Sequence, residues 1–390
     1  MLRRFFYFLS SLQLAITCLA AATALLFAGT LAQVNSGIHE VQDRYFHSLL
    51  VWWPVGSHGF QIPVFPGGHL LGGILLINLI AAHVRRFKWS WGKLGIHLIH
   101  AGLIIILLGG LFTDLFSVES FIKLAPGETK NYSEDSRLME LAVIDESGKD
   151  LDKVTAISEA RLSQGETIEH ESLPFRIIVR KFYPNSRLQS IDKAGVQAMP
   201  AATQGVGAQT IVKEVPRATA QNDRDMESAV IEIVPVPSAA EVTAQSLGTW
   251  LVSDQLETPQ RFSYAGKQWQ LILRLARYYK PYSLTLQKFT HDRYPGTQIP
   301  KNFASLAILI DPDHQENRNV LITMNHPLRY RGETFFQSGF LENSTILQDV
   351  YNPSFIAPYL ACVIVGLGLL IQFTYHFVGF LTRRRKSLAQ

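Results

Sequence analysis

The sequence predicts a membrane protein with four transmembrane α-helices and a large, mainly β extracytoplasmic domain inserted between the third and fourth helices. Charged residues make up only 17% of the 390 residues, whereas an ordinary soluble domain has about 25%. Four stretches carry no charged side chain at all, and they are residues 5–38, 45–84, 94–113 and 351–382. The intervening residues 114–350 carry 25 basic and 30 acidic residues. This pattern excludes a soluble enzyme, a disordered chain and, because the basic residues form no patch, a nucleic-acid-binding protein.

Each uncharged stretch contains a segment that is long enough, or nearly so, to cross a bilayer, which takes about 20 apolar residues. The expected spans are residues 12–32, 70–84, 94–113 and 356–377. The second span reaches full length only if residues 67–69 are included. The first span is longer than the core of a signal peptide, which usually has 7–15 apolar residues. We therefore expect it to be retained as a true span.

The basic residues that flank the spans predict the orientation. They precede the first span, fill the loop between the second and third, and follow the fourth; they are Arg3, Arg4, Arg85, Arg86, Lys88, Lys93, Arg383, Arg384, Arg385 and Lys386. In the loop of residues 33–69, Arg44 is the only Lys or Arg residue. By the positive-inside rule, both termini of this cytoplasmic (inner) membrane protein lie in the cytoplasm. Residues 114–350 then form the periplasmic domain, between a three-helix part (1–113) and a one-helix part (351–390).

The outer domain has the sequence pattern of an antiparallel sandwich or open barrel. Its β-rich or alternating runs are separated by turn signals, and they are residues 139–144, 175–179, 229–234, 269–273, 283–287, 306–310, 320–324 and 334–337. Residues 190–224 are rich in Ala, Gln and Gly and predict a long loop. In the loop between the first two spans, residues 45–53 predict a short interfacial helix.

The two cysteines, Cys18 and Cys362, both lie in expected spans. A disulfide scaffold, a CxxC redox pair and a CxxCH haem-attachment site are therefore excluded. The chain has no GxSxG elbow, Walker loop or HExxH motif. It offers no nucleophile with a credible base.

Three histidines are expected to gather in the cytoplasmic half of the helix bundle. His97 and His100 are three residues apart, so they share one helix face. The short loop that follows the second span should return the chain antiparallel and bring His83 to the same depth. Ionisable groups at that depth suggest function, and a neutral imidazole is a natural axial ligand of haem iron. The alternative is that each histidine simply reaches the headgroups or bonds a backbone carbonyl.

The remaining histidines are weaker candidates. Those of the outer loop, which are His39, His47, His58 and His69, are expected to be solvated, and His376 lies near the inner end of the fourth span. His326 occupies a turn-like position that favours a structural role. Gly102, Gly109 and Gly110 on the third span favour close helix packing over an approach by a flat macrocycle.

The run of residues 324–340, MNHPLRYRGETFFQSGF, resembles the signature of ResB/CcsB-type System II cytochrome c biogenesis proteins. In that family MNxPLxYxGxxFYQ precedes the last span. Residues 280–289, KPYSLTLQKF, are similar to the strand that comes before this signature. The first span opens with SLQLA at residues 11–15, and the third contains His100-Ala101-Gly102; both are similar to the family pattern.

The resemblance implies a role in cytochrome c maturation. Family members pair with a CcsA/ResC-type membrane protein, carry haem b transiently from the cytoplasmic side, and present it to apocytochrome c for thioether attachment. The family's histidine in the third span matches His100, and His97 and His83 lie close enough to remain candidate ligands, with His326 a weak one. Arg85 and Arg86 could balance the haem propionates or could only determine topology.

The resemblance also implies further partners. The chain itself lacks a catalytic constellation and a CxxC pair, so we expect it to be part of a holocytochrome c synthase complex, together with a thioredoxin-like thiol reductant. No partner half follows residue 390, so we expect the partner to be a separate chain. Two alternatives stay open: a b-type haem electron-transfer protein, and a membrane-anchored scaffold or sensor whose outer domain binds a ligand or apocytochrome.

Overall fold

The computed structural model describes residues 2–55, 60–149, 151–194, 199–218, 224–236, 245–297, 300–341 and 343–388. The chain divides into two compact units. The helical unit contains Met1–Val118 and Tyr351–Gln390, and the β unit contains Glu119–Ala218 and Asn222–Val350. Each unit is described by itself.

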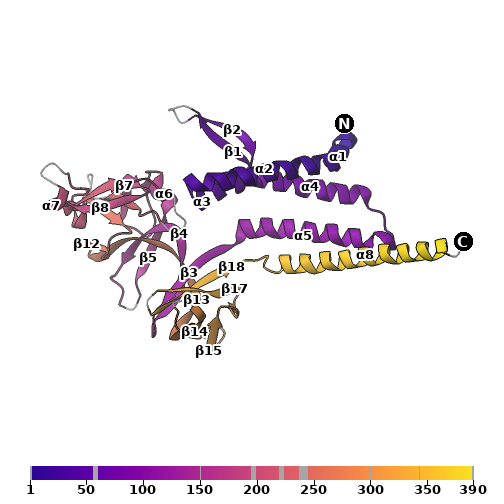
Figure 1. Cartoon of the computed structure of the whole chain (residues 1–390). Helices are drawn as coiled ribbons and strands as arrows, with labels where there is room; N and C mark the ends of the chain where they lie inside the picture. Colours follow the sequence, from indigo (N-terminus) through magenta and orange to yellow (C-terminus); the bar gives the residue numbers. More distant parts are fainter. Residues whose placement is uncertain are drawn as a thin grey trace. The chain divides into compact units, whose positions relative to one another are not determined.

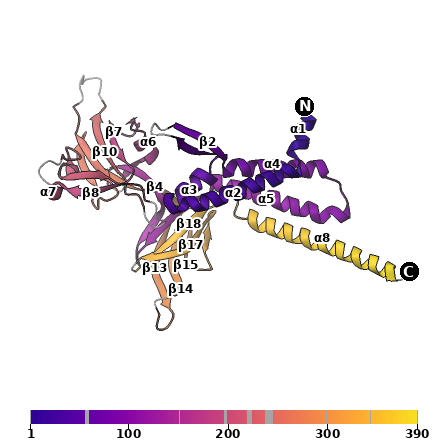
Figure 2. The same cartoon turned by 45° about the horizontal axis from the view of Figure 1, so that its top comes forward.

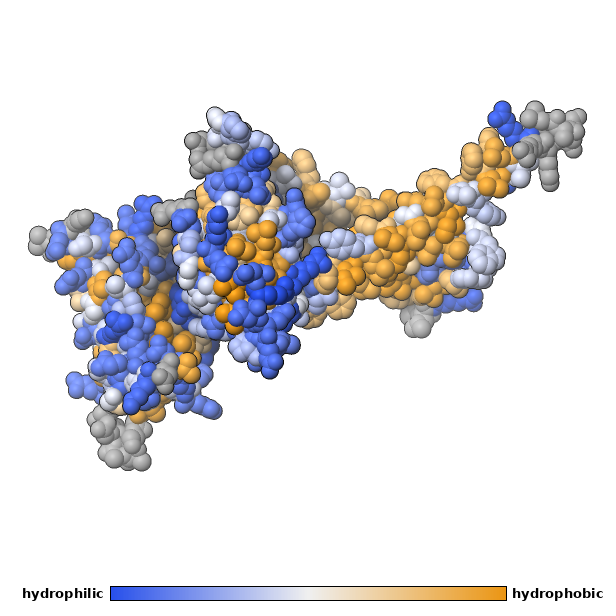
Figure 3. Space-filling model, turned by 90° about the horizontal axis from the view of Figure 1, so that it is seen from below, coloured by the Kyte–Doolittle hydropathy of each residue, from blue (hydrophilic) through white to orange (hydrophobic). Residues whose placement is uncertain are grey.

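The helical unit is built from helices whose surfaces are apolar. In the described part of the chain, four helices are long and apolar enough to cross a membrane. They are α2 (Leu12–Ser36), α4 (Gly68–Arg86), α5 (Leu94–Phe116) and α8 (Ala357–Leu388) (Figure 1). Figure 3 shows that hydrophobic residues dominate their surface, whereas hydrophilic residues are frequent on the β unit. The predicted fold class, four apolar helices and a large β domain between the third and fourth, is confirmed.

A short helix α1 (Leu2–Leu9) precedes the first span and is separated from it by a break at Ser10. The Ser11 side chain caps α2 by accepting a hydrogen bond from the Leu14 amide. The buried Asn78 of α4 donates to the carbonyl oxygens of Leu9 and Ser11 at 2.6 and 2.9 Å. The break is therefore held by a polar side chain from the second span.

The loop between the first two spans is not the interfacial helix that we expected over residues 45–53. It contains α3 (Ile38–Val41), a π-helical turn η1 (Gln42–Phe46) and a β-hairpin of β1 (Leu50–Val55) and β2 (Phe60–Pro66). The two strands pair antiparallel from Leu50 with Pro66 to Val55 with Phe60. β-Branched and aromatic residues favour a strand, and Pro54 disfavours a helix interior, so the helix prediction was wrong.

A seam of glycines joins the third and fourth spans. Gly95, Gly102 and Gly109 recur every seven residues and are all buried. A Cβ atom at Gly102 would lie 2.5 Å from Val365 Cγ2, and one at Gly109 would lie 2.5 Å from the Ala357 Cβ. The expectation that glycines serve close helix packing is thus confirmed for Gly102 and Gly109, whereas a Cβ at Gly110 would meet open space.

The β unit is dominated by one ten-stranded antiparallel sheet that curls into a nearly closed barrel (Figure 2). The main path runs β15-β14-β13-β4-β3-β18-β17-β16, with β12 beside β13 and β5 beside β4. The strands are β3 (Val118–Leu124), β4 (Thr129–Asp145), β5 (Lys153–Ser158), β12 (Gln260–Tyr264), β13 (Lys267–Arg293), β14 (Pro300–Asp311), β15 (Glu316–Thr323), β16 (Leu328–Tyr330), β17 (Glu333–Leu341) and β18 (Ser344–Tyr351). Two predicted runs, residues 269–273 and 283–287, belong to the single bulged strand β13.

A second sheet of four strands has the order β11-β10-β7-β6. Its strands are β6 (Thr167–Ile168), β7 (Phe175–Tyr183), β10 (Ser228–Pro235) and β11 (Thr249–Ser253). The inner faces of both sheets share one core that includes Phe175, Ile231, Trp269 and Leu271. A separate core inside the barrel includes Leu284, Leu309 and Phe335.

The long loop predicted over residues 190–224 is in part a hairpin. Strand β8 (Ser186–Ser190) pairs with β9 (Thr210–Glu214), and the 3₁₀ turn η3 (Gly205–Gln209) lies between them. Residues 195–198 and 219–223 of the predicted loop lie outside the described residues. The remaining short helices are α6 (Glu159–Ser163), α7 (Ile191–Ala194) and the 3₁₀ turn η2 (Trp91–Lys93).

Candidate functional site

The hairpin of α4 and α5 brings three histidine rings together. The centroid of the His83 ring lies 5.2 Å from that of His97 and 5.7 Å from that of His100. All three side chains are half-buried. The predicted gathering of these histidines is confirmed.

Two local features position the His97 ring. Its Nε2 atom lies 3.2 Å from the carbonyl oxygen of Lys88, in the loop that joins the helices. The Phe87 ring lies 4.8 Å from the same imidazole. Because a carbonyl only accepts, Nε2 is the donor, and a neutral His97 then has its lone pair on Nδ1. This Nδ1 is buried and has no partner among the described residues.

The side chains of His83 and His100 make no hydrogen bond within the described part of the chain. Their nitrogens are therefore not committed to another protein group. The seven-residue glycine seam faces α8, and the helical period of 3.6 residues places His97 and His100 on the other side of α5. The three imidazole rings thus form a compact cluster on the α4 side of the third span.

The two arginines that follow His83 differ in their surroundings. Arg85 donates from Nη1 to the Ser10 hydroxyl at 2.7 Å, and its guanidinium lies 4.5 Å from the centre of the Tyr7 ring. It therefore supports the break between α1 and α2. Arg86 is exposed.

A second polar cluster lies at the other end of the same two helices, which sequence analysis did not anticipate. His69 Nε2 lies 2.6 Å from Asp114 Oδ2, and His47 Nε2 lies 3.3 Å from Asp114 Oδ1. The two imidazole rings stack at 5.8 Å, and His47 also contacts Asp43 at 3.3 Å. We expected these histidines to be solvated; the His47 and His69 side chains are 48% and 32% exposed, and both also contact Asp114 in the last turn of α5. His58 and the side chain of His39 lie outside the described residues.

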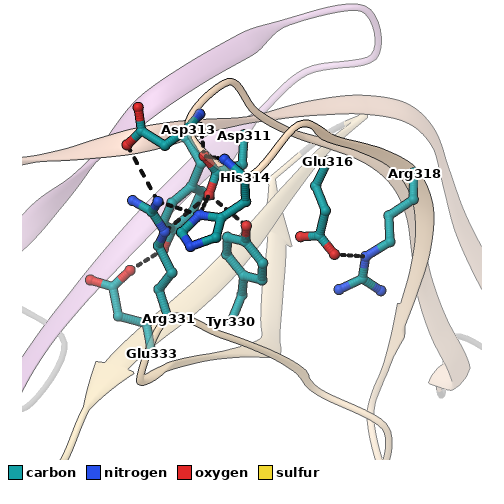
Figure 4. Close-up of polar contacts among 9 residues, drawn as sticks. Asp311, Asp313, His314, Glu316, Arg318, Tyr330, Arg331 and Glu333 are labelled. Atoms are coloured by element: carbon teal, nitrogen blue, oxygen red, sulfur yellow. Dashed lines mark hydrogen bonds and ion pairs between the residues drawn. The ribbon is translucent and has the colours of Figure 1, made fainter.

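The signature run of residues 324–340 folds as the hairpin β16–β17 of the barrel. Its turn is formed by Arg331 and Gly332, whose φ angles are 48° and 83°. Glycine takes a positive φ without a steric penalty, which explains its place in the signature. Tyr330 donates to Asp311 Oδ2 at 2.5 Å, and Arg331 Nε lies 3.0 Å from the same oxygen (Figure 4). The hairpin is thus fixed to the turn between β14 and β15.

Asp311 is the anionic centre of this contact. It is fully buried, and burial alone would raise its pKa. Hydrogen bonds from Tyr330 and His314 and the charge of Arg331 outweigh that effect and lower the pKa of Asp311 to about 2. Asp311 therefore stays ionised at neutral pH.

Two polar side chains of β17, Glu333 and Gln337, attach this strand to other barrel strands. Glu333 pairs with Lys280 and accepts a hydrogen bond from Tyr282, both on β13. Lys280 also lies 2.6 Å from the buried Asp349. Farther along β17, the Gln337 side chain bonds to Ser305 of β14 at 2.6 Å. Sequence analysis identified the signature but could not assign these partners.

His326 lies in the turn between β15 and β16. Its backbone exchanges two hydrogen bonds with Thr323, and its side chain is exposed. Within the helical unit, His376 lies 2.6 Å from Gln372 Nε2 on the same helix.

These features define a multi-pass membrane protein with four candidate spans and a large β domain, and with a histidine cluster between two of the spans. Residues 265–354 match the ResB-like family. Over these residues the chain is similar to ResB-like proteins. The matched region begins just before β13 and ends after β18, so it includes the hairpin β16–β17.

Two relatives support distant homology. Protein NrfI of Wolinella succinogenes is 37% identical over 92 residues, which are 23% of this chain and 10% of NrfI. Cytochrome c biogenesis protein CcsB of Picosynechococcus sp. is 32% identical over 79 residues, which are 20% of this chain and 17% of that protein. The matches therefore span only a small part of either relative.

Proposed function

We propose that the chain acts in System II cytochrome c maturation. Together with a CcsA/ResC-type membrane protein, it moves haem b across the cytoplasmic membrane and presents it to apocytochrome c for thioether attachment. The match of residues 265–354 to the ResB-like family and the likeness to a cytochrome c biogenesis protein support this role. The single observation that carries the haem step is the contact of the His83 ring with both His97 and His100.

Haem is the cargo in this proposal, and its iron takes an imidazole as an axial ligand. His100 and His83 are the first candidates because neither ring is hydrogen-bonded within the described part of the chain. His97 positions the set, since its Nε2 is held by the Lys88 carbonyl. A second axial ligand would come from the partner.

The haem propionates need a cationic environment. Arg86 is exposed and one helical turn from His83, so it suits this role better than Arg85, which Ser10 and Tyr7 engage. Arg86 and the neighbouring Lys88 and Lys93 also support the proposed orientation, with this loop in the cytoplasm. The domain limits then follow as 1–113 and 351–390 for the membrane parts and 114–350 for the periplasmic part.

The outer domain would hold the apocytochrome. Free strand edges can accept an extended peptide as an additional strand, and β15 ends the main path of the sheet in this domain. The cysteine thiols of the acceptor would be kept reduced by a separate thioredoxin-like protein, because this chain has no CxxC pair.

The experiment is to co-express the chain with a CcsA/ResC-type partner in a bacterium that lacks its own maturation system, together with a c-type cytochrome reporter. His100→Ala and His83→Ala should abolish or strongly reduce covalent haem in the reporter. His326→Ala, an exposed turn histidine of the β unit, is the matched control and should leave it unchanged. Normal assembly with a His83→Ala/His97→Ala/His100→Ala triple variant would contradict the proposal.

Haem content separates transport from permanent binding. The purified chain without its partner should hold little haem if the cargo is transient. Stoichiometric haem in the chain alone would instead favour a b-type electron-transfer protein.

A further inference from the structure

The hairpin β1–β2 exposes more apolar surface than a water-facing element of its size would. Its outer half carries large side chains that are 39–65% exposed, and they are Trp52, Trp53, Val55, Phe60, Ile62 and Val64. Residues 45–84 contain no charged side chain, so no charge interrupts this surface. A two-stranded hairpin alone is at best marginally stable in water. We therefore expect the exposed apolar side chains of this hairpin to be buried against another surface.

The root of the hairpin is fixed to the start of the second span. Val51 is buried beside Leu25, Val41, Tyr45 and Leu71. The Gly67 amide donates to the Leu49 carbonyl at 2.9 Å, and the His69 amide donates to the Ser48 carbonyl at 3.2 Å. A Cβ atom at Gly67 would lie 2.2 Å from the Ser48 oxygen, so the two segments touch through their backbones. The hairpin therefore cannot move far along the axis of α4.

The Arg44 side chain contacts strand β1 and stabilises its position. Arg44 donates from Nη2 to the Trp52 carbonyl at 3.0 Å, and its guanidinium lies 5.6 Å from the centre of the Trp53 ring. The contacts of His69 and His47 with Asp114 connect the same region to the end of α5. The apolar half of the hairpin is thus held at the level where both spans end.

Two physical limits decide what covers this surface. Open strand edges leave backbone groups without partners, which the hydrocarbon core does not tolerate. Tryptophan side chains, however, favour the headgroup level of a bilayer. We propose that the β1–β2 hairpin lies in the membrane interface beside the outer ends of the spans. Lipid then covers Trp52, Trp53, Phe60 and Val64, while headgroups and water satisfy the strand edges.

The first test is fluorescence quenching of the full chain in nanodiscs whose phospholipids carry bromine on the acyl chains, either near the headgroup or near the methyl end. Bromine near the headgroup should quench part of the tryptophan emission of the parent chain. The Trp52→Phe/Trp53→Phe variant should lack this quenched part of the emission. Trp250→Phe/Trp269→Phe, which changes two buried tryptophans of the β unit, should keep it. An equal loss of quenching in both variants would contradict the proposal.

A second measurement does not alter any tryptophan. Val64→Cys in a Cys18→Ser/Cys362→Ser background carries a nitroxide spin label, with the exposed Asn319→Cys of β15 as the matched control. Collisions with oxygen should exceed those with a water-soluble nickel chelate at position 64, and the reverse should hold at position 319. Equal accessibility to the nickel chelate at both positions would show a hairpin that faces water, and protection of position 64 from both oxygen and the chelate would show a covering protein. Stronger quenching by bromine near the methyl end would place the hairpin in the hydrocarbon. Each of these results overturns the inference.

Discussion

At the scale of single residues, the histidine cluster and the Asp311 contact use polar groups in opposite ways. His83 and His100 leave their ring nitrogens free of hydrogen bonds within the described residues, as a site for a passing ligand requires. Asp311 is saturated by Tyr330, His314 and Arg331, as a fixed structural joint requires. The ring nitrogens of His83 and His100 are thus available for a new contact, whereas the hairpin β16–β17 is fixed by its hydrogen bonds and ion pair.

Removing one hydroxyl group tests that joint. Tyr330→Phe deletes the hydrogen bond to the buried carboxylate of Asp311, and hydrogen bonds to charged groups contribute about 1.5–3 kcal/mol. We expect a lower melting temperature of the β unit, measured by circular dichroism on the full chain in detergent. Tyr294→Phe, at a side chain that is 51% exposed, is the matched control. Equal melting temperatures for both variants would show that the joint does not stabilise the barrel.

A buried carboxyl group predicts a pH dependence of stability. Burial, with the neighbouring Glu159, raises the pKa of Glu227 to about 8, so the folded chain retains a proton that the unfolded chain loses near pH 4.5. Stability from this group is therefore present at low pH and is lost as the pH rises toward 8, with a slope of up to about 1.4 kcal/mol per pH unit.

Glu227→Gln should flatten this dependence. Melting temperatures of the β unit from pH 5 to pH 8 are the measurement, and the variant should gain stability over the parent chain toward pH 8. A parent chain whose melting temperature stays constant over that range would contradict the assignment.

At the scale of elements, the periodic segments could be predicted from the sequence and the short ones could not. The four spans follow from hydropathy alone. Seven of the eight β-rich runs fall within strands, and the eighth, residues 320–324, extends one residue beyond β15. The hairpin β1–β2 was missed because residues 45–53 are apolar without a clear period, so a short helix and a strand could not be separated. The hairpin β8–β9 was missed because each strand has only five residues and the residues between the strands are rich in Ala, Gln and Gly.

The glycine seam gives a prediction for one element pair. Gly102→Val places side-chain atoms where Val365 and the Ala361 carbonyl oxygen already lie, and overpacking costs about 1–3 kcal/mol. We expect the variant to lower the melting temperature of the purified protein and its yield from membranes. Gly110→Val, where a Cβ meets open space, should behave like the parent chain. A lower melting temperature for Gly110→Val than for Gly102→Val would show that α8 does not pack on this glycine seam.

At the scale of the whole molecule, the region that matches the ResB-like family and the residues of the proposed haem site lie in different parts of the chain. The ResB-like match covers residues 265–354, all in or next to the barrel, whereas the three histidines lie in the second and third spans. The sequence could predict that His83, His97 and His100 meet, because their spacing and the short loop determine it. It could not predict that Arg85 is engaged by Ser10 and Tyr7 or that His47 and His69 share Asp114. Those contacts join residues from elements that are distant in sequence.

The central claim is that an imidazole of the α4–α5 hairpin ligates haem iron. The most direct test is chemical rescue of His100→Gly, purified with a CcsA/ResC-type partner, by free imidazole. We predict that the variant loses the Soret and α bands of the parent complex and that added imidazole restores both the bands and covalent haem in the reporter cytochrome. A His100→Gly complex with the parent spectrum, in which His83→Gly and His97→Gly are also without effect, would contradict the claim.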